Sequence, residues 1–135
     1  MKAQATYSVQ KWKEDNWRVI SPESKMTKAS VEYALKGAIE CAEAVEYLMF
    51  YKYFDSKDPH KSSAQYVGLM NLMGKLDGKS GSFAVEDEGR FESGEAVSKL
   101  RILEGSGTGE LKGIRGTGNY RAGPGGSSFE LDYHF

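Results

Sequence analysis

The chain has 135 residues, of which 39% are hydrophobic and 27% are charged, so we expect one globular domain over residues 1–135 and exclude a disordered polypeptide. Its 18 basic and 19 acidic residues balance and are scattered, which argues against a nucleic-acid partner. No apolar run resembles a secretion signal or a membrane span, so we expect a cytoplasmic protein without a membrane partner.

Alternation of apolar and polar residues predicts about eight β-strands. Turn residues rich in glycine, proline, serine and aspartate separate them. In chain order, the predicted strands cover residues 5–12, 30–36, 45–54, 64–73, 81–88, 96–103, 117–122 and 128–135.

The segment 38–54 admits two interpretations. Alanine and glutamate favour a helix, and Ile39, Ala42, Val45 and Met49 could share one helical face. Its second half is rich in aromatic residues and lacks a polar helical face, so we favour a strand from about Ala44 onward.

A glycine pattern occurs twice, as GKLDGKSGSF (74–83) and GELKGIRGTGNY (109–120). Neither copy has the spacing of a phosphate-binding loop or of a dinucleotide fingerprint. We interpret both copies as corners at the same end of an antiparallel sheet, where glycine permits the bend and Leu76 and Leu111 plug the core.

Five segments along the chain carry a resemblance to a known family. They are TKASVEYALKGAIE, AVEYLMFY, YVGLMNLMGKLDGKSGSF, GSGTGELKGIRGTGNY and the final FELDYHF. In this order they resemble a bacterial family of small proteins of unknown function whose fold is similar to the barrel of plant allene oxide cyclase. The resemblance implies an all-β, closed eight-stranded antiparallel barrel, and it implies no catalytic residues.

An aromatic cluster and one acid are the candidate site. An eight-stranded barrel either fills its interior or keeps room for one small ligand. Buried tyrosine hydroxyls need polar partners. The candidate ligand-lining residues, which strand parity would direct inward, are Tyr33, Tyr47, Met49, Tyr51, Tyr66 and Asp87. Asp87 continues the parity of Phe83 and Val85 but lies near a predicted strand end, where water could reach it.

The remaining polar residues give weaker signals. Strand parity places Glu32 and Glu46 on a solvated outer face. His60 and His134 have no partner at metal-binding spacing, and Cys41 is the only cysteine. We therefore expect neither a cofactor nor a metal ion.

Three functions fit these patterns. The first is binding of a small apolar molecule in the barrel lumen. The second is an isomerase or cyclase that uses an inward-facing carboxylate as an acid or base. The third is a filled barrel that acts only through its surface. The sequence leaves open whether the protein is an enzyme.

Two strands are apolar on both faces, which predicts that their outer face is covered. Leu48 and Phe50 oppose the inward residues of the third strand, and one parity of 64–73 lies beside them. We expect a homodimer or small homo-oligomer with these two residues as anchors. The alternative is that a loop or the N-terminal segment around Trp17 folds over the same patch.

Overall fold

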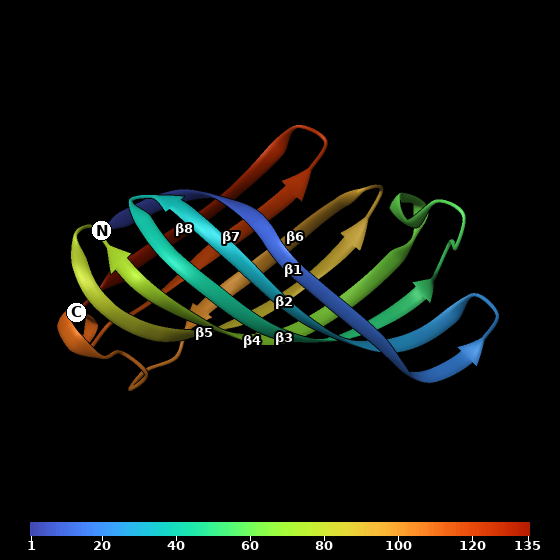
Figure 1. Ribbon diagram of the computed structural model, residues 1–135, viewed down its shortest axis with the longest axis horizontal. Helices are drawn as coiled ribbons and strands as arrows, with labels where there is room; N and C mark the ends of the chain where they lie inside the picture. Colours follow the sequence, from blue (N-terminus) through green and yellow to red (C-terminus); the bar gives the residue numbers. More distant parts are fainter.

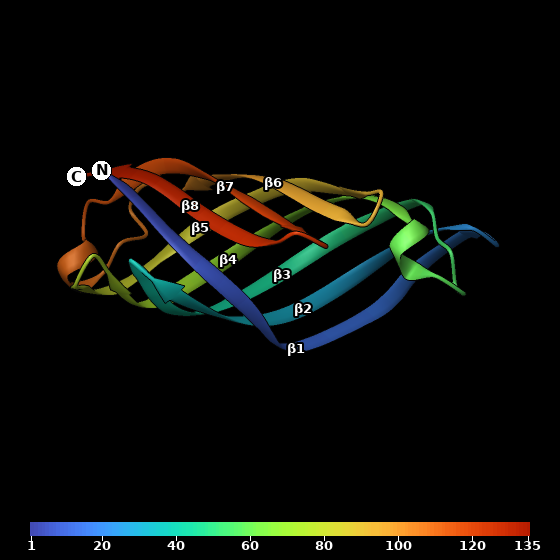
Figure 2. The ribbon, with the colours of Figure 1, turned by 90° about the horizontal axis from the view of Figure 1, so that it is seen from above.

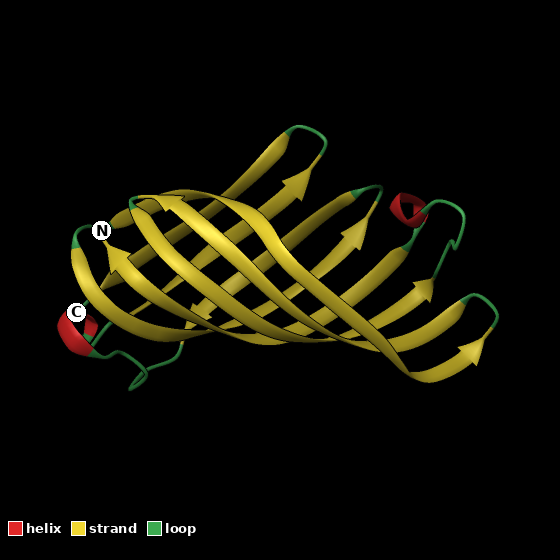
Figure 3. Ribbon diagram, in the orientation of Figure 1, coloured by secondary structure: helices red, strands yellow, loops and turns green.

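Residues 1–135 are described by a computed structural model that contains eight antiparallel strands and two 3-10 turns (Figures 1 and 3). The strands are β1 (Lys2–Ser21), β2 (Ser24–Gly37), β3 (Ile39–Tyr53), β4 (Ser63–Leu76), β5 (Lys79–Glu92), β6 (Glu95–Ile102), β7 (Arg115–Gly123) and β8 (Gly126–His134). The turns are η1 (Pro59–Lys61), before β4, and η2 (Gly109–Leu111), before β7. Neither turn is a helix of the length and apolar character that would span a bilayer.

The strands form a ring because each pairs with the next in the chain and β1 also pairs with β8. The expected all-β architecture of eight antiparallel strands is confirmed. All eight predicted segments lie within strands, apart from residues at the ends of some of them. The first strand is longer than expected, and β3 begins at Ile39 rather than near Ala44.

The helical interpretation of the start of the segment 38–54 is therefore wrong. Ile39, Cys41 and Glu43 are buried while Glu40 and Ala42 are exposed, which is the period of two that a half-buried strand requires. Pairing with β2 and β4 along this stretch outweighs the helical preference of alanine and glutamate.

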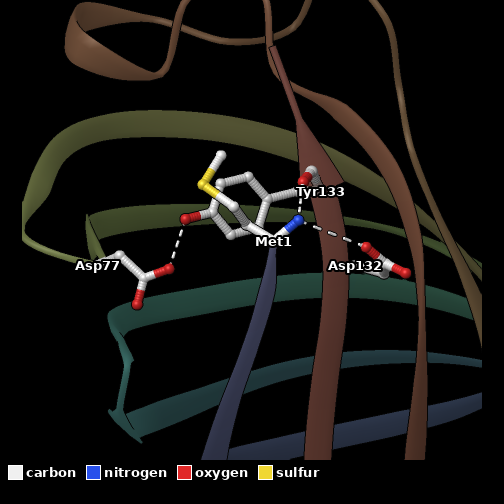
Figure 4. Close-up of polar contacts among 4 residues, drawn as sticks. All are labelled: Met1, Asp77, Asp132 and Tyr133. Atoms are coloured by element: carbon white, nitrogen blue, oxygen red, sulfur yellow. Dashed lines mark hydrogen bonds and ion pairs between the residues drawn. The ribbon is translucent and has the colours of Figure 1, made fainter.

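Polar contacts reinforce the β1–β8 seam, which has only four residue pairs in register (Figure 4). The Met1 amine donates a hydrogen bond of 2.9 Å to the Tyr133 carbonyl and lies 3.7 Å from an Asp132 carboxylate oxygen. The Tyr133 hydroxyl donates to the carboxylate of Asp77, in the turn between β4 and β5. The seam is thus tied to the opposite wall at the end of the ring that holds both termini.

The two ends of the ring differ (Figures 1 and 2). Both termini and η2 lie at one end, called here the η2 end, whereas η1 and the β1–β2 turn lie at the other, the η1 end. At the η2 end, the two glycine-patterned corners meet, because the Ser80 amide donates to a Glu110 carboxylate oxygen at 3.1 Å. Leu76 and Leu111 are fully buried there. The corner interpretation is confirmed, and side chains fill this end.

Candidate functional site

A cavity of about 320 Å³ lies in the interior toward the η1 end, where Pro59 of η1 lines it. Its wall is mostly aromatic. The lining residues are Trp12, Glu14, Tyr33, Tyr47, Met49, Tyr51, Phe54, Pro59, Ser62, Tyr66, Phe91, Ala96 and Tyr120. This volume is at the lower end of the range of small-molecule sites.

The structure brings the sequence-predicted residues together around this cavity. Those that line it are Tyr33, Tyr47, Met49, Tyr51 and Tyr66. Asp87 is not part of the wall and lies behind it, where one of its carboxylate oxygens accepts a hydrogen bond of 2.8 Å from the Tyr47 hydroxyl. Asp87 is fully buried in the middle of β5, so the expectation that water reaches it is wrong.

Protein groups bind several of the tyrosine hydroxyls that line the cavity. The Tyr66 hydroxyl lies 2.6 Å from Ser98 Oγ, and the Tyr120 hydroxyl donates to that of Tyr7 at 2.6 Å. Burial raises the pKa of Tyr66 and Tyr120 above the ordinary value of a phenol, so both rings stay neutral. The wall is therefore preorganised by hydrogen bonds within the protein.

Glu14 on β1 lies in the cavity wall and accepts three hydrogen bonds. One carboxylate oxygen accepts from Thr27 Oγ1 at 2.6 Å and from the Tyr51 hydroxyl at 2.8 Å. The other accepts from the Trp12 indole N–H at 3.1 Å. These donors come from three strands and fix the carboxylate on the wall.

Glu43 and Asp87 form a buried pair of acids inside the ring. Asp87 Oδ1 has no hydrogen-bond partner, and burial raises the pKa of Asp87 to about 6. Glu43 on β3 is 4% exposed; burial, and then the nearby charge of Asp87, raise the pKa of Glu43 to about 8. Both groups titrate near neutral pH, in the range suited to acid–base chemistry.

Sequence reasoning missed Glu43 and Glu14. Glu43 shares the parity of Val45 and Tyr47, a signal that was available once the strand was extended to Ile39. Glu14 turns inward because a register shift between Val9 and Lys11 reverses the parity of β1. Nothing in the sequence marks that shift.

The other sequence-predicted polar residues lie away from the cavity. Glu32 and Glu46 are exposed on the outer face, as expected. Burial raises the pKa of the Cys41 thiol to about 11, which makes the thiol unreactive. No His, Cys, Asp or Glu side chains are grouped in a way that could hold a metal ion.

Leu48 and Phe50, the proposed oligomer anchors, lie on the outside of β3. Leu48 is 53% exposed and faces Val67 of β4, whereas Phe50 is half-buried. An outer groove of about 570 Å³ contains both anchors together with Trp17 and Met26. Trp17 thus reaches part of this patch, while Leu48 and Val67 stay exposed.

Two inward-facing glycines make room for the tyrosine rings. A Cβ on Gly68 would lie 2.6 Å from Cδ1 of Tyr47, its partner across the strand pair. A Cβ on Gly89 would lie 2.6 Å from the Tyr66 hydroxyl and 2.5 Å from Ser98 Oγ. Any larger side chain at these positions collides with the cavity wall.

We predict that Gly68→Ala lowers the free energy of unfolding by about 1–3 kcal/mol, because the methyl group displaces the Tyr47 ring and overpacks the wall. Urea unfolding followed by near-ultraviolet circular dichroism measures the free energy of unfolding and reports on the displaced tyrosine ring. The control is Gly125→Ala, since no atom lies within 4 Å of a Cβ at that turn position. Equal stability of the two variants would contradict the packing argument.

We predict that Glu43→Gln stabilises the protein above pH 8 and has little effect at pH 5. The pKa of Glu43 is about 8 in the folded chain against an ordinary value of 4.5. Between these values the folded state holds a proton that the unfolded chain has released, so wild-type stability falls as pH rises through this window.

Glutamine at position 43 does not titrate, so it removes the fall of stability with rising pH. We expect the melting temperature at pH 9 to rise by roughly 15 °C, because a pKa of about 8 in the folded chain against 4.5 in the unfolded chain corresponds to about 5 kcal/mol, at about 1.4 kcal/mol for each tenfold difference in proton affinity. Glu46→Gln, on the outer face of the same strand, is the matched control. A gain at pH 5 equal to that at pH 9 would show that Glu43 is not the titrating group.

Comparison with known proteins identifies the family. Residues 3–134 match the family described as "Protein of unknown function (DUF3224)". The chain is similar to the crystal structure of a DUF3224 protein of unknown function from Shewanella oneidensis MR-1, with a TM-score of 0.80 and 25% identity over 100% of this chain and 96% of that one. No protein of curated function matches the sequence. The chain therefore belongs to the DUF3224 family.

Proposed function

We propose that this protein binds a small, largely apolar molecule in the interior cavity, within a barrel of the type found in plant allene oxide cyclase. The observation that carries the proposal is the contrast between the two ends. Side chains fill the η2 end, whereas the η1 end keeps about 320 Å³ among aromatic side chains. A concave, mostly apolar site with a few fixed polar groups is the usual form of a ligand pocket.

Native mass spectrometry of freshly purified protein tests the binding proposal. We expect a co-purifying small molecule that is released on denaturation. The variant Ala96→Phe places a ring in the cavity wall and should reduce the bound fraction severalfold while the fold is kept. A ligand retained equally by wild type and variant lies elsewhere, and a bare wild-type mass would argue against occupancy.

A second candidate, favoured by the buried acids, is an isomerase or cyclase. The Asp87 carboxylate holds the hydroxyl of Tyr47, whose ring lines the cavity. A desolvated acid with a pKa near 6 can accept a proton from a bound molecule and return it through such a hydroxyl. Recovery of a chemically altered ligand after incubation would favour this candidate over binding alone.

We further propose a homodimer or small homo-oligomer that buries the outer apolar patch. The patch consists of the exposed Leu48, Val67 and Leu69 with the half-buried Phe50. Leu48 pairs with Val67 across neighbouring strands, so the apolar surface is continuous. Monomeric proteins rarely leave large apolar patches in water.

Changing Leu48 and Phe50 together to glutamate should yield a folded monomer in sedimentation velocity. The wild type should sediment as an oligomer at micromolar concentration. The matched control is Lys52→Glu, which changes the charge of an exposed residue on the same strand without removing apolar surface. A monomeric wild type would refute the oligomer proposal and leave the cavity proposal unaffected.

A further inference from the structure

We infer that the cavity selects small organic cations, in which an ammonium or trimethylammonium group is carried on an apolar body. This inference rests on the proposed binding function, because it names the ligand class for the same cavity. It is carried by three features of the interior: the sign of its charges, the direction of its hydroxyl groups and the aromatic character of its wall.

The charged side chains in and behind the cavity wall are all acidic. Glu14 lines the cavity, while Glu43 and Asp87 are buried behind it. No lysine, arginine or histidine is buried in the protein, and none of the three acids belongs to an ion pair. Negative charge without a partner in a desolvated interior attracts a cation and repels an anion.

Two tyrosine hydroxyls on the wall donate their protons to these acids. Tyr47 donates to Asp87, and Tyr51 donates to Glu14. A hydroxyl that has donated its single proton keeps only acceptor lone pairs. The polar atoms that Tyr47 and Tyr51 leave for a ligand are therefore acceptors, which suit the N–H groups or the positive surface of an ammonium ion better than a carboxylate.

The aromatic faces favour the same class of ligand. A cation within about 6 Å of a ring centroid is attracted by the negative face of the ring. Lys25 already illustrates this at the edge of the cavity, because its ammonium nitrogen lies 3.6 Å from the centroid of Phe54 and 5.6 Å from that of Tyr51. Lys25 is not part of the wall, so the cavity itself has no basic group.

Because the buried acids titrate, the affinity of the cavity for a cation should depend on pH. Burial raises the pKa of Asp87 to about 6 and that of Glu43 to about 8, so acidification neutralises both. The other charged or titratable groups nearby are the wall residue Glu14, Lys25 beside Phe54, exposed His60 next to the lining Pro59, and tyrosines that stay neutral. Affinity for a cation should therefore increase from pH 5 to pH 8.

Three benzyl compounds that differ in charge test the inference by NMR titration of the full chain. They are benzyltrimethylammonium, neopentylbenzene, in which carbon replaces the charged nitrogen, and the anion phenylacetate. We expect the cation to bind at least about tenfold more tightly than the neutral isostere, and phenylacetate not to bind. The preference should shrink severalfold at pH 5.

Asp87→Asn separates charge from shape, because asparagine keeps an acceptor for Tyr47 while it removes the negative charge. We expect at least a fivefold loss of cation affinity and unchanged affinity for the neutral isostere. Glu88→Gln, exposed on the same strand, is the control and should change neither. If Asp87→Asn fails to melt cooperatively, Glu43→Gln takes its place and is compared with the wild type at pH 9, where the Glu43 carboxyl is ionised, with the same expected pattern.

The two proposals fail in different ways. Equal binding of benzyltrimethylammonium and neopentylbenzene, or tighter binding of phenylacetate, would overturn the cation inference and leave small-molecule binding standing. Failure of all three probes to bind, together with a bare mass for the purified protein, would overturn both.

Discussion

Space inside the ring is the constraint on which the rest of the structure depends. Every second residue of each strand points into one narrow interior, so a large side chain on one strand requires a small one opposite. Tyr47 lies against Gly68, and Tyr66 lies against Gly89. These glycines weaken their strands, because they have no side chain to pack and a larger conformational entropy when unfolded. What they provide in return is an aromatic wall whose rings stand in fixed positions around a cavity.

The buried acids lower the stability of the fold, so their presence points to a role other than stability. Desolvation raises the pKa of both Glu43 and Asp87, so at neutral pH the folded state holds a proton on Glu43 and a desolvated charge on Asp87, whereas both carboxylates are ionised and hydrated in the unfolded chain. Asp87 Oδ1 gains no hydrogen bond in return. Apolar residues of similar volume would stabilise the interior more. Groups that cost stability and lie beside a cavity are characteristic of functional sites, where charge serves a ligand or a reaction.

Strand parity made most of the fold and much of the site predictable. The alternation around Tyr47 and Tyr51 placed their side chains on one face, and the structure directs them into the cavity. Glu43 was missed because the alanine-rich start of β3 resembles a helix, although pairing on both sides makes it a strand. Glu14 was missed for a different reason. A register shift near Val9 reverses which residues of β1 face inward, and such a shift depends on how neighbouring strands twist rather than on local sequence.

Net charge is a poor guide to the field inside this protein. The total of −1 arises because 18 basic residues nearly cancel 19 acidic ones. The ion pairs between side chains join exposed or half-exposed residues on the outside, such as Arg101 with Glu86 at 2.8 Å. Water screens these outer charges, whereas the interior acids Glu43 and Asp87 are poorly screened. The inner carboxylates therefore act on the cavity more strongly than the outer lysines and arginines do, and the cavity potential is negative where Asp87 is ionised, although the molecule as a whole is almost neutral.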